Sequence, residues 1–136
     1  MYLLQGKNIT CGYDTVDILS ECTVGVKKGK ITSIVGPNGA GKSTAMKSIF
    51  GLLKIRLGKI FLDNEDITNL LPQERVLKGM GYVPQTNNIF PTLSVQENLE
   101  MGAFIQHEDF SDILDYVYNL FPILKEKRHQ SAGELS

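Results

Sequence analysis

One segment constrains the fold of this chain more than any other: residues 36–43, Gly-Pro-Asn-Gly-Ala-Gly-Lys-Ser, fit the pattern G-x-x-x-x-G-K-[ST]. A chance match in a chain of this length is on the order of 1 in 200. A short apolar segment, Ile31–Val35, precedes the glycines and reads as a buried strand. Apolar residues at helical spacing follow Gly41. Strand, glycine-rich loop and helix in this order predict a loop that binds phosphate.

Each residue type in this loop has a physical role toward a phosphate. The glycines at 36, 39 and 41 let backbone N–H groups approach phosphate oxygens without a Cβ in the way. The start of the following helix adds a partial positive charge. Lys42 supplies a point charge for the β- and γ-phosphates, and the Ser43 hydroxyl is a hard oxygen ligand for Mg²⁺. Thr44 is a candidate contact to the α-phosphate. The loop alone leaves small GTPases, kinases and motor ATPases open.

Composition excludes several other classes of protein. The chain has 136 residues with 14 basic and 15 acidic side chains, a net charge of −1, which argues against a nucleic-acid binder with a basic face. A hydrophobic fraction of 42% predicts a globular chain. The N-terminus has no signal-peptide pattern, and the longest apolar run, Ile49–Leu53, is far shorter than the ~20 residues of a membrane span. Cys11 and Cys22 have no metal-site spacing and are expected to be reduced thiols.

The first two thirds of the chain read mainly as strands. Further strands are expected over 3–13 and 18–26, around a turn at 14–17, and a small β element is expected over 58–63 and 65–67. A short strand is predicted over 80–84. Helices are predicted from Gly41 through Leu53 and from Pro72 to Lys78.

The last third reads as helical. Ser94 and Glu97 form a capping box at a predicted helix start. A stripe of apolar residues follows and is expected to pack as core; its members are Phe110, Ile113, Leu114, Val117 and Phe121. The order of elements predicts a nucleotide-binding core followed by a helical appendage.

Residues 36–44 resemble the phosphate loop of ABC-transporter ATPase subunits, and that segment consists of Gly36, Pro37, Asn38, Gly39, Ala40, Gly41, Lys42, Ser43 and Thr44. The resemblance implies an α/β fold: a P-loop NTPase core with an antiparallel β-subdomain over 1–85, and a partial helical subdomain over 86–136. It implies ATP and Mg²⁺ as cofactors. Tyr13 falls where the family stacks an aromatic ring on adenine, worth about 1–3 kcal/mol by analogy with base stacking. Gln85, in Tyr82-Val83-Pro84-Gln85, matches the family's glutamine that reaches Mg²⁺ or the attacking water. The resemblance therefore implies Gln85 and Lys42 as the catalytic residues.

The same resemblance implies partners and a place in the cell. ATP would lie between two ATPase subunits, and the helical subdomain would dock on transmembrane permease subunits at the cytoplasmic face of the membrane. Ile89, Phe90 and Leu93 are candidate docking residues, with a local hydrophobic staple as the alternative. The amino-acid sequences of residues 89–91, 97–103 and 132–136 are most similar to those of subunits that energise branched-chain amino-acid import.

Several parts of the family pattern are absent from these 136 residues. The signature Leu-Ser-Gly-Gly-Gln is represented by Leu135 and Ser136 only. Neither the family's apolar strand ending in Asp-Glu nor the histidine that follows it and senses the γ-phosphate is found. The segment Ile60–Asp63 is followed by Asn64, so it is predicted to be a β-subdomain strand with Asp63 in a turn. The chain is therefore expected to be an N-terminal part without turnover of its own. Two alternatives stay open: a nucleotide-binding module, and an ABC ATPase not involved in transport.

Overall fold

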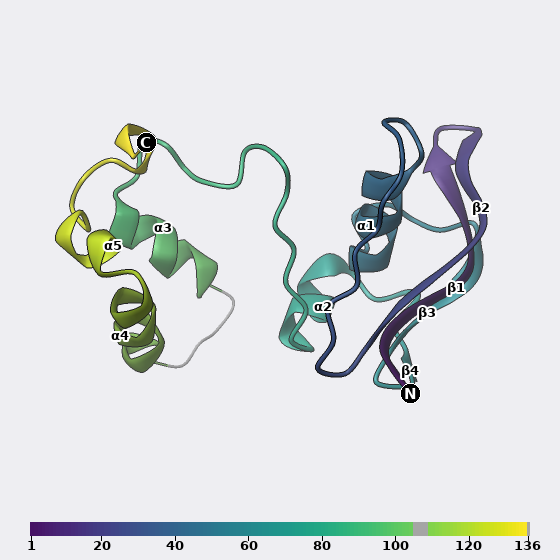
Figure 1. The fold of residues 1–136 in the computed structure, drawn as a ribbon, viewed down its shortest axis with the longest axis horizontal. Coiled ribbons are helices and arrows are strands. Elements are labelled where there is room, and N and C mark those ends of the chain that lie inside the picture. The colour runs from purple at the N-terminus through teal and green to yellow at the C-terminus, as the bar shows by residue number, and fades with distance from the viewer. Residues whose placement is uncertain (105–108, 136) are drawn as a thin grey trace. The chain divides into compact units, whose positions relative to one another are not determined.

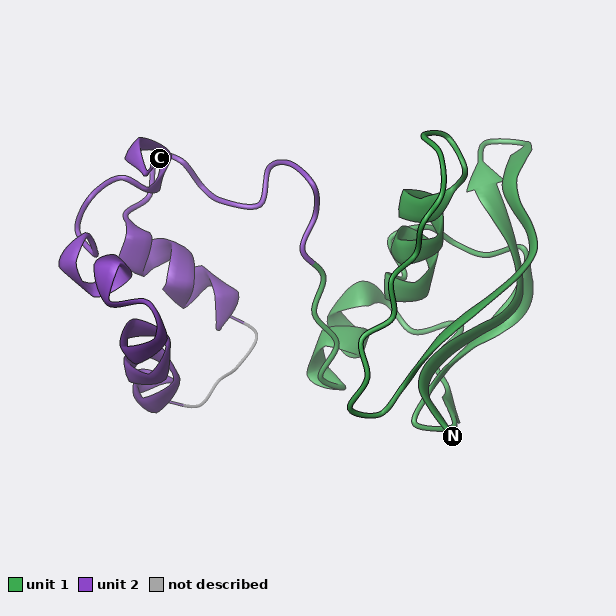
Figure 2. Ribbon diagram, in the orientation of Figure 1, with its two compact units in different colours: residues 1–82 green, residues 83–136 purple. Residues whose placement is uncertain are grey.

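The computed structural model describes residues 1–104 and 109–135. The chain divides into two compact units, 1–82 and 83–136 (Figure 2). The division falls three residues before the predicted domain boundary at 85/86, which stays a prediction. Ser136, half of the predicted start of the signature, lies outside the described residues.

A long antiparallel hairpin forms the frame of the first unit (Figure 1). Strand β1 (Tyr2–Tyr13) pairs with β2 (Val16–Lys27), and Tyr13 lies opposite Val16 beside the turn. Asp14 in that turn has φ 49°, a conformation that Asp tolerates better than most residues. The two strands predicted at the N-terminus are confirmed.

Two shorter strands complete the sheet. Strand β3 (Leu57–Leu62) pairs with β1, and β4 (Glu65–Asp66) pairs with β3, giving the antiparallel order β2-β1-β3-β4. Asp63 and Asn64 form the two-residue turn between β3 and β4, and both have positive φ, as a type I′ hairpin turn requires. The prediction that Ile60–Asp63 belongs to an antiparallel β-subdomain, with Asp63 in a turn, is confirmed.

Helix α1 (Lys42–Phe50) packs on one face of this sheet (Figure 1). The buried core lies between them and consists of Ile9, Cys11, Leu19, Ala45, Ile49, Ile60 and Ile67. The helix ends at Phe50 rather than at the predicted Leu53, because Gly51 adopts the left-handed conformation at φ 88° and stops the helix. Helix α2 (Pro72–Leu77) follows, with proline at its first position as predicted.

Two predicted strands are not strands in the structure. Residues 31–35 and 80–84 make no strand pairing with the described residues, and Ile31 and Val35 are 96% and 88% exposed. A strand needs a neighbour for its backbone N–H and C=O groups, and the strands of the described sheet, β1 to β4, pair only with one another. The predictions of a buried strand at 31–35 and of a strand at 80–84 are therefore wrong.

The second unit is helical. It contains α3 (Val95–Gly102), α4 (Ser111–Leu120), α5 (Pro122–Glu126) and a 3₁₀ turn at Ala132–Glu134. The predicted capping box is present: the Ser94 hydroxyl accepts from the Glu97 amide at 3.2 Å, and the Glu97 carboxylate accepts from the Ser94 amide at 2.7 Å. Two hydrogen bonds from Ser94 lower the pKa of the Glu97 carboxyl; the bond from the backbone amide has the larger effect, and the bond from the hydroxyl the smaller.

The apolar stripe of α4 is less buried than its spacing predicts. Ile113 is 53% exposed and Phe121, which follows the helix, is 55% exposed, whereas Tyr118 is buried. Helices of this length can bury one narrow face against their neighbours, and α4 presents Tyr118 there. No helix within the described ranges is long and apolar enough to cross a membrane.

The exposed segment 31–35 generates a prediction. An apolar extended segment with unpaired backbone groups is a template for pairing with another chain, so the 136-residue polypeptide is expected to self-associate as its concentration rises. Val35→Lys should reduce this association, since an edge lysine opposes strand pairing. Val16→Lys, on the already paired strand β2, is the matched control. Sedimentation velocity measures the effect; equal association of Val35→Lys and wild type would contradict the expectation.

Candidate functional site

The glycine-rich loop reaches helix α1 through a tight turn. The Ala40 amide donates to the Pro37 carbonyl at 3.3 Å, and Gly39 has φ 83°, the conformation that a turn of this kind needs at its third position. A Cβ at Gly39 would meet nothing within 4 Å, so backbone conformation is what favours glycine here. Gly41, also at φ 83°, lies against β2: a Cβ there would come within 2.7 Å of Leu19 Cδ2.

The N-terminus of α1 is left without a cap. The N-cap residue, Gly41, has no side chain to accept a hydrogen bond, and the first turn contains no acidic residue. The first N–H groups of a helix lack intrahelical acceptors, and they carry the positive end of the helix dipole. By contrast, the start of α3 is closed by Ser94 and Glu97. The start of α1 therefore suits an external anion.

Lys42 lies across the loop that it belongs to. Its Nζ donates to the Gly36 carbonyl at 2.8 Å and to the Pro37 carbonyl at 2.7 Å. These bonds tie the side chain of Lys42, the first residue of α1, back to the start of the loop. A phosphate placed there would meet a fixed positive charge as well as backbone N–H groups.

The two hydroxyl residues after Lys42 differ in exposure. Ser43 is exposed, so its oxygen is accessible to a cation, and a serine hydroxyl is a ligand of the kind that Mg²⁺ accepts. Thr44 is 6% exposed and lies in the packed side of the helix. The chemistry of the donors fits Mg²⁺ at Ser43, and the α-phosphate contact of Thr44 stays a prediction.

Tyr13 lies beside the same helix. Tyr13 is 46% exposed, and the Nζ atom of Lys47 is 5.9 Å from its ring centroid, within the range of a cation–π contact. Lys47 follows Ser43 by four residues and so shares its face of the helix. The hairpin thus brings Tyr13 to the face of α1 that carries Ser43. Sequence reasoning missed Lys47, although its helical spacing from Ser43 was visible.

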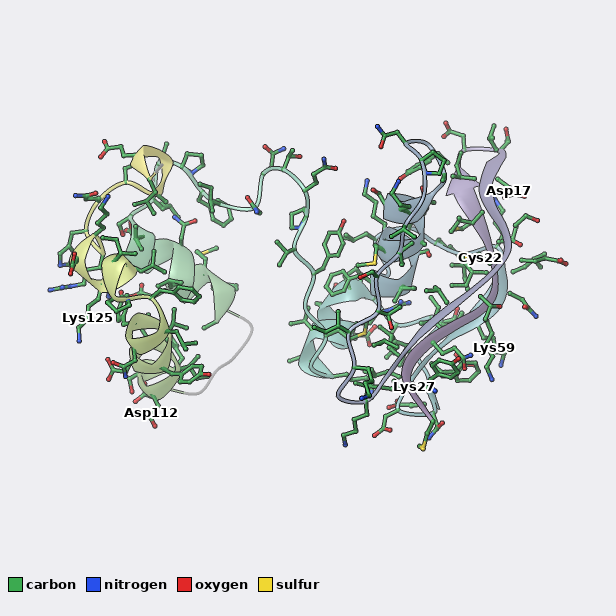
Figure 3. The ribbon with its side chains drawn as sticks, in the orientation of Figure 1. Asp17, Cys22, Lys27, Lys59, Asp112 and Lys125 are labelled. Carbon is green, nitrogen blue, oxygen red and sulfur yellow. The ribbon has the colours of Figure 1, made fainter. Side chains whose placement is uncertain are left out.

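Arg56 fastens the hairpin that carries Tyr13. The guanidinium pairs with the Asp17 carboxylate and donates to the Asp14 carbonyl, both near the hairpin turn, and the Arg56 amide donates to the Thr10 carbonyl at 2.8 Å. Figure 3 shows Asp17 at this end of the sheet. The ion pair is partly exposed, so its contribution to stability is small, about 0–1 kcal/mol. Its role is to fix the backbone around Tyr13; no sequence motif signals it.

Gln85 belongs to a different compact unit from these residues. It is exposed, in a bend between α2 and α3, and it belongs to the second compact unit. The structure therefore brings together the loop, Lys42, Ser43 and Tyr13 within the first unit, whereas the pairing of Gln85 with Ser43 stays a prediction. No cluster of three or more metal-binding side chains of the His, Cys, Asp or Glu type is found within residues 1–104 and 109–135.

The geometry defines a nucleotide-binding domain of the phosphate-loop class. Comparison with known proteins narrows this class, because the profile of the family described as "ABC transporter" matches residues 19–136. The chain belongs to the ABC transporter family of ATP-binding proteins.

Individual relatives and structures agree with this assignment. The chain is 41% identical over 135 residues to the probable branched-chain amino acid transport ATP-binding protein LivF of Archaeoglobus fulgidus, covering 98% of the chain and 57% of that protein. It is 35% identical to the high-affinity branched-chain amino acid transport ATP-binding protein BraG of Pseudomonas aeruginosa, covering 98% and 58%. The solved structure of a nucleotide-free ATP-binding cassette from an ABC transporter superposes with a TM-score of 0.80 at 33% identity, covering 100% of the chain and 60% of that structure. The chain thus spans somewhat more than half the length of each of these three proteins.

The position of Tyr13 generates a prediction. Tyr13→Ala should weaken the binding of ATP by about 1–3 kcal/mol, the loss of one base–aromatic stack, or roughly 5- to 150-fold in Kd. Tyr13→Phe keeps the ring and should bind as the wild type does. Isothermal titration with ATP and, separately, with inorganic tripolyphosphate measures both effects. Tripolyphosphate has no base, so an equal loss for both ligands would contradict a stacking role.

Proposed function

We propose that this chain binds Mg·ATP through residues 36–44 and forms the nucleotide-gripping part of an ABC-transporter ATPase subunit. The observation that carries the proposal is the uncapped start of α1, with Lys42 held across the adjoining loop by two carbonyls. Backbone N–H groups, the helix dipole and the ammonium all favour a polyphosphate at one place.

Each remaining residue takes a role around that phosphate. Ser43 holds Mg²⁺ through its hydroxyl, and Tyr13 stacks on the adenine ring. Gln85 would contribute an amide oxygen to the metal or the attacking water. Bound Mg²⁺ would supply charge neutralisation at the phosphates; the protein's own contribution is to position the phosphates and the water.

In the whole subunit we expect hydrolysis of ATP to ADP and phosphate to be coupled to transport. The names of the two relatives described above favour import of branched-chain amino acids. Another relative, the lipopolysaccharide export system ATP-binding protein LptB of Escherichia coli, is 36% identical over 111 residues, so the family match alone does not select the solute. The proposed partners are a second ATPase subunit and transmembrane permease subunits, which would hold the protein at the cytoplasmic face of the membrane. We make no proposal of nucleic-acid binding, since the net charge is −1.

Binding of Mg·ATP to the 136-residue polypeptide tests the proposal. Lys42→Ala should raise the Kd about 10- to 100-fold, because it removes charge-assisted hydrogen bonds to the phosphates. Lys54→Ala removes an exposed charge of the same sign elsewhere in the first unit and is the control. Unchanged affinity in Lys42→Ala would contradict the assignment of the loop.

Turnover is the second measurement. The 136 residues contain no apolar strand ending in Asp-Glu, so we expect this polypeptide to bind Mg·ATP with phosphate release no faster than background. Robust hydrolysis would refute this expectation. Uptake of labelled leucine in membranes that carry the whole subunit and its permease, with Lys42→Ala as the negative control, tests the proposed solute.

A further inference from the structure

Arg75, in α2, is the largest fully buried side chain of the described residues, at 2% exposure. Arginine is almost never fully buried unless its charge is paired. The ion pairs formed by residues 1–104 and 109–135 are Arg56–Asp17, Lys59–Asp66 and Lys78–Glu65, and none includes Arg75. Burial lowers the pKa of the guanidinium. Its charge must therefore be compensated by neutral groups.

Four backbone carbonyls surround the guanidinium. Nε donates to the Leu70 carbonyl at 3.0 Å, and Nη2 donates to the Thr68 carbonyl at 2.9 Å. Nη1 donates to the carbonyls of Ile49 and Ser48, the latter at 3.4 Å. A flat group with donors on several edges can bind two separate segments at once, here residues 48–49 and 68–70, which a lysine ammonium cannot match in geometry.

Two of these carbonyls belong to the last turn of α1. The last carbonyls of a helix have no intrahelical donors and carry the negative end of the dipole, so a buried cation there is well placed. Gly51 permits the contact: a Cβ at this residue would lie 3.0 Å from both Cζ and Nε of Arg75. Arg75 thus attaches α2 and the preceding turn to the C-terminal end of α1.

The chain after Arg75 is fixed to the same turn. The Met80 amide donates to the Arg75 carbonyl at 3.1 Å. The Tyr82 ring stacks on Phe50, the last residue of α1, with centroids 5.3 Å apart and an interplanar angle of 24°. Both ends of segment 75–82 are therefore attached to the final turn of α1. Gln85 follows this segment three residues further along the chain.

Helix α1 has nine residues, and a helix of this length is marginal without tertiary contacts. Its N-terminal residues, Lys42 and Ser43, belong to the candidate site, so a shift at its C-terminus moves them as well. We propose that Arg75 is a positioning residue of the phosphate loop, which sets the orientation of α1 from its C-terminal end. The proposal rests on the function proposed above for Lys42 and Ser43, and it adds a residue that touches no part of the nucleotide.

The test compares Arg75→Met with two controls in the 136-residue polypeptide. Lys78→Met removes the same charge from the C-cap residue of the same helix, where the ammonium pairs with Glu65. Ile60→Ala opens a cavity on the sheet side of the core that packs against α1, so it is the comparison for a loss of packing without loss of the Arg75 contacts; urea unfolding measures the stability of each variant. Arg75→Lys keeps the positive charge but replaces the planar guanidinium by an ammonium with fewer N–H donors.

Mg·ATP affinity, measured by titration at a temperature where every variant is folded, is the first readout. Arg75→Met should raise the Kd about tenfold, the scale expected for misplacing charge-assisted phosphate contacts. Lys78→Met should stay within about twofold of wild type. Ile60→Ala should raise the Kd less than Arg75→Met does, because Ile9, Cys11 and Leu19 remain in the core that holds α1 on the sheet. Arg75→Lys should fall between Arg75→Met and wild type. A Kd for Arg75→Met no higher than that of Ile60→Ala at matched stability would overturn the proposal. If Arg75→Met does not fold, Arg75→Lys against Ile60→Ala decides in the same way.

Amide hydrogen exchange without nucleotide is the second readout, and it separates this proposal from the proposed function. Arg75→Met should accelerate exchange in residues 42–50 more than Ile60→Ala does at matched stability. Equal exchange in the two variants would overturn the positioning role. If wild type and Lys42→Ala bind Mg·ATP equally, the proposed function fails, while faster exchange in Arg75→Met would still show that Arg75 holds α1.

Discussion

The packing of α1 against the hairpin sheet is the constraint on which the rest of the first unit depends. Ala45 and Ile49 enter the core that Ile9, Cys11 and Ile60 form on the sheet, and this fixes which side of the helix faces inward. Ser43 and Lys47 are then left on the outward side, where Lys47 lies beside Tyr13. One buried apolar stripe therefore determines where the polar residues of the candidate site lie.

The site follows from local geometry and long-range packing together. Gly39 and Gly41 supply backbone conformations that other residues adopt at a cost, and the absence of a side-chain cap leaves the helix start free for an anion. The neighbouring elements supply position: β2 lies against Gly41, the hairpin carries Tyr13, and Arg75 holds the far end of α1. The loop motif determines which groups could contact a phosphate, and the packing against the sheet and α2 determines where those groups lie.

Sequence patterns predicted the elements whose information is local. The hairpin strands, the turn at Asp63, the helix after Gly41 and the capping box at Ser94 each depend on neighbouring residues, and each is confirmed. Ile31–Val35 has the composition of a buried strand, but pairing needs a neighbour that composition does not reveal. Arg75 and Arg56 were not predicted as structural residues, because their partners are backbone carbonyls and side chains far along the chain. The relation of Gln85 to Ser43 depends on two units and stays a prediction.

The contacts of Lys42 bear on which anions this loop would select. Its ammonium already donates hydrogen bonds to the carbonyls of Gly36 and Pro37, so a ligand must interact with the ammonium more strongly than those two carbonyl dipoles do. A singly charged anion gains little by that exchange, whereas a polyphosphate adds several charges at the same position and also engages the helix start. We therefore expect the loop to favour polyphosphates over small monovalent anions.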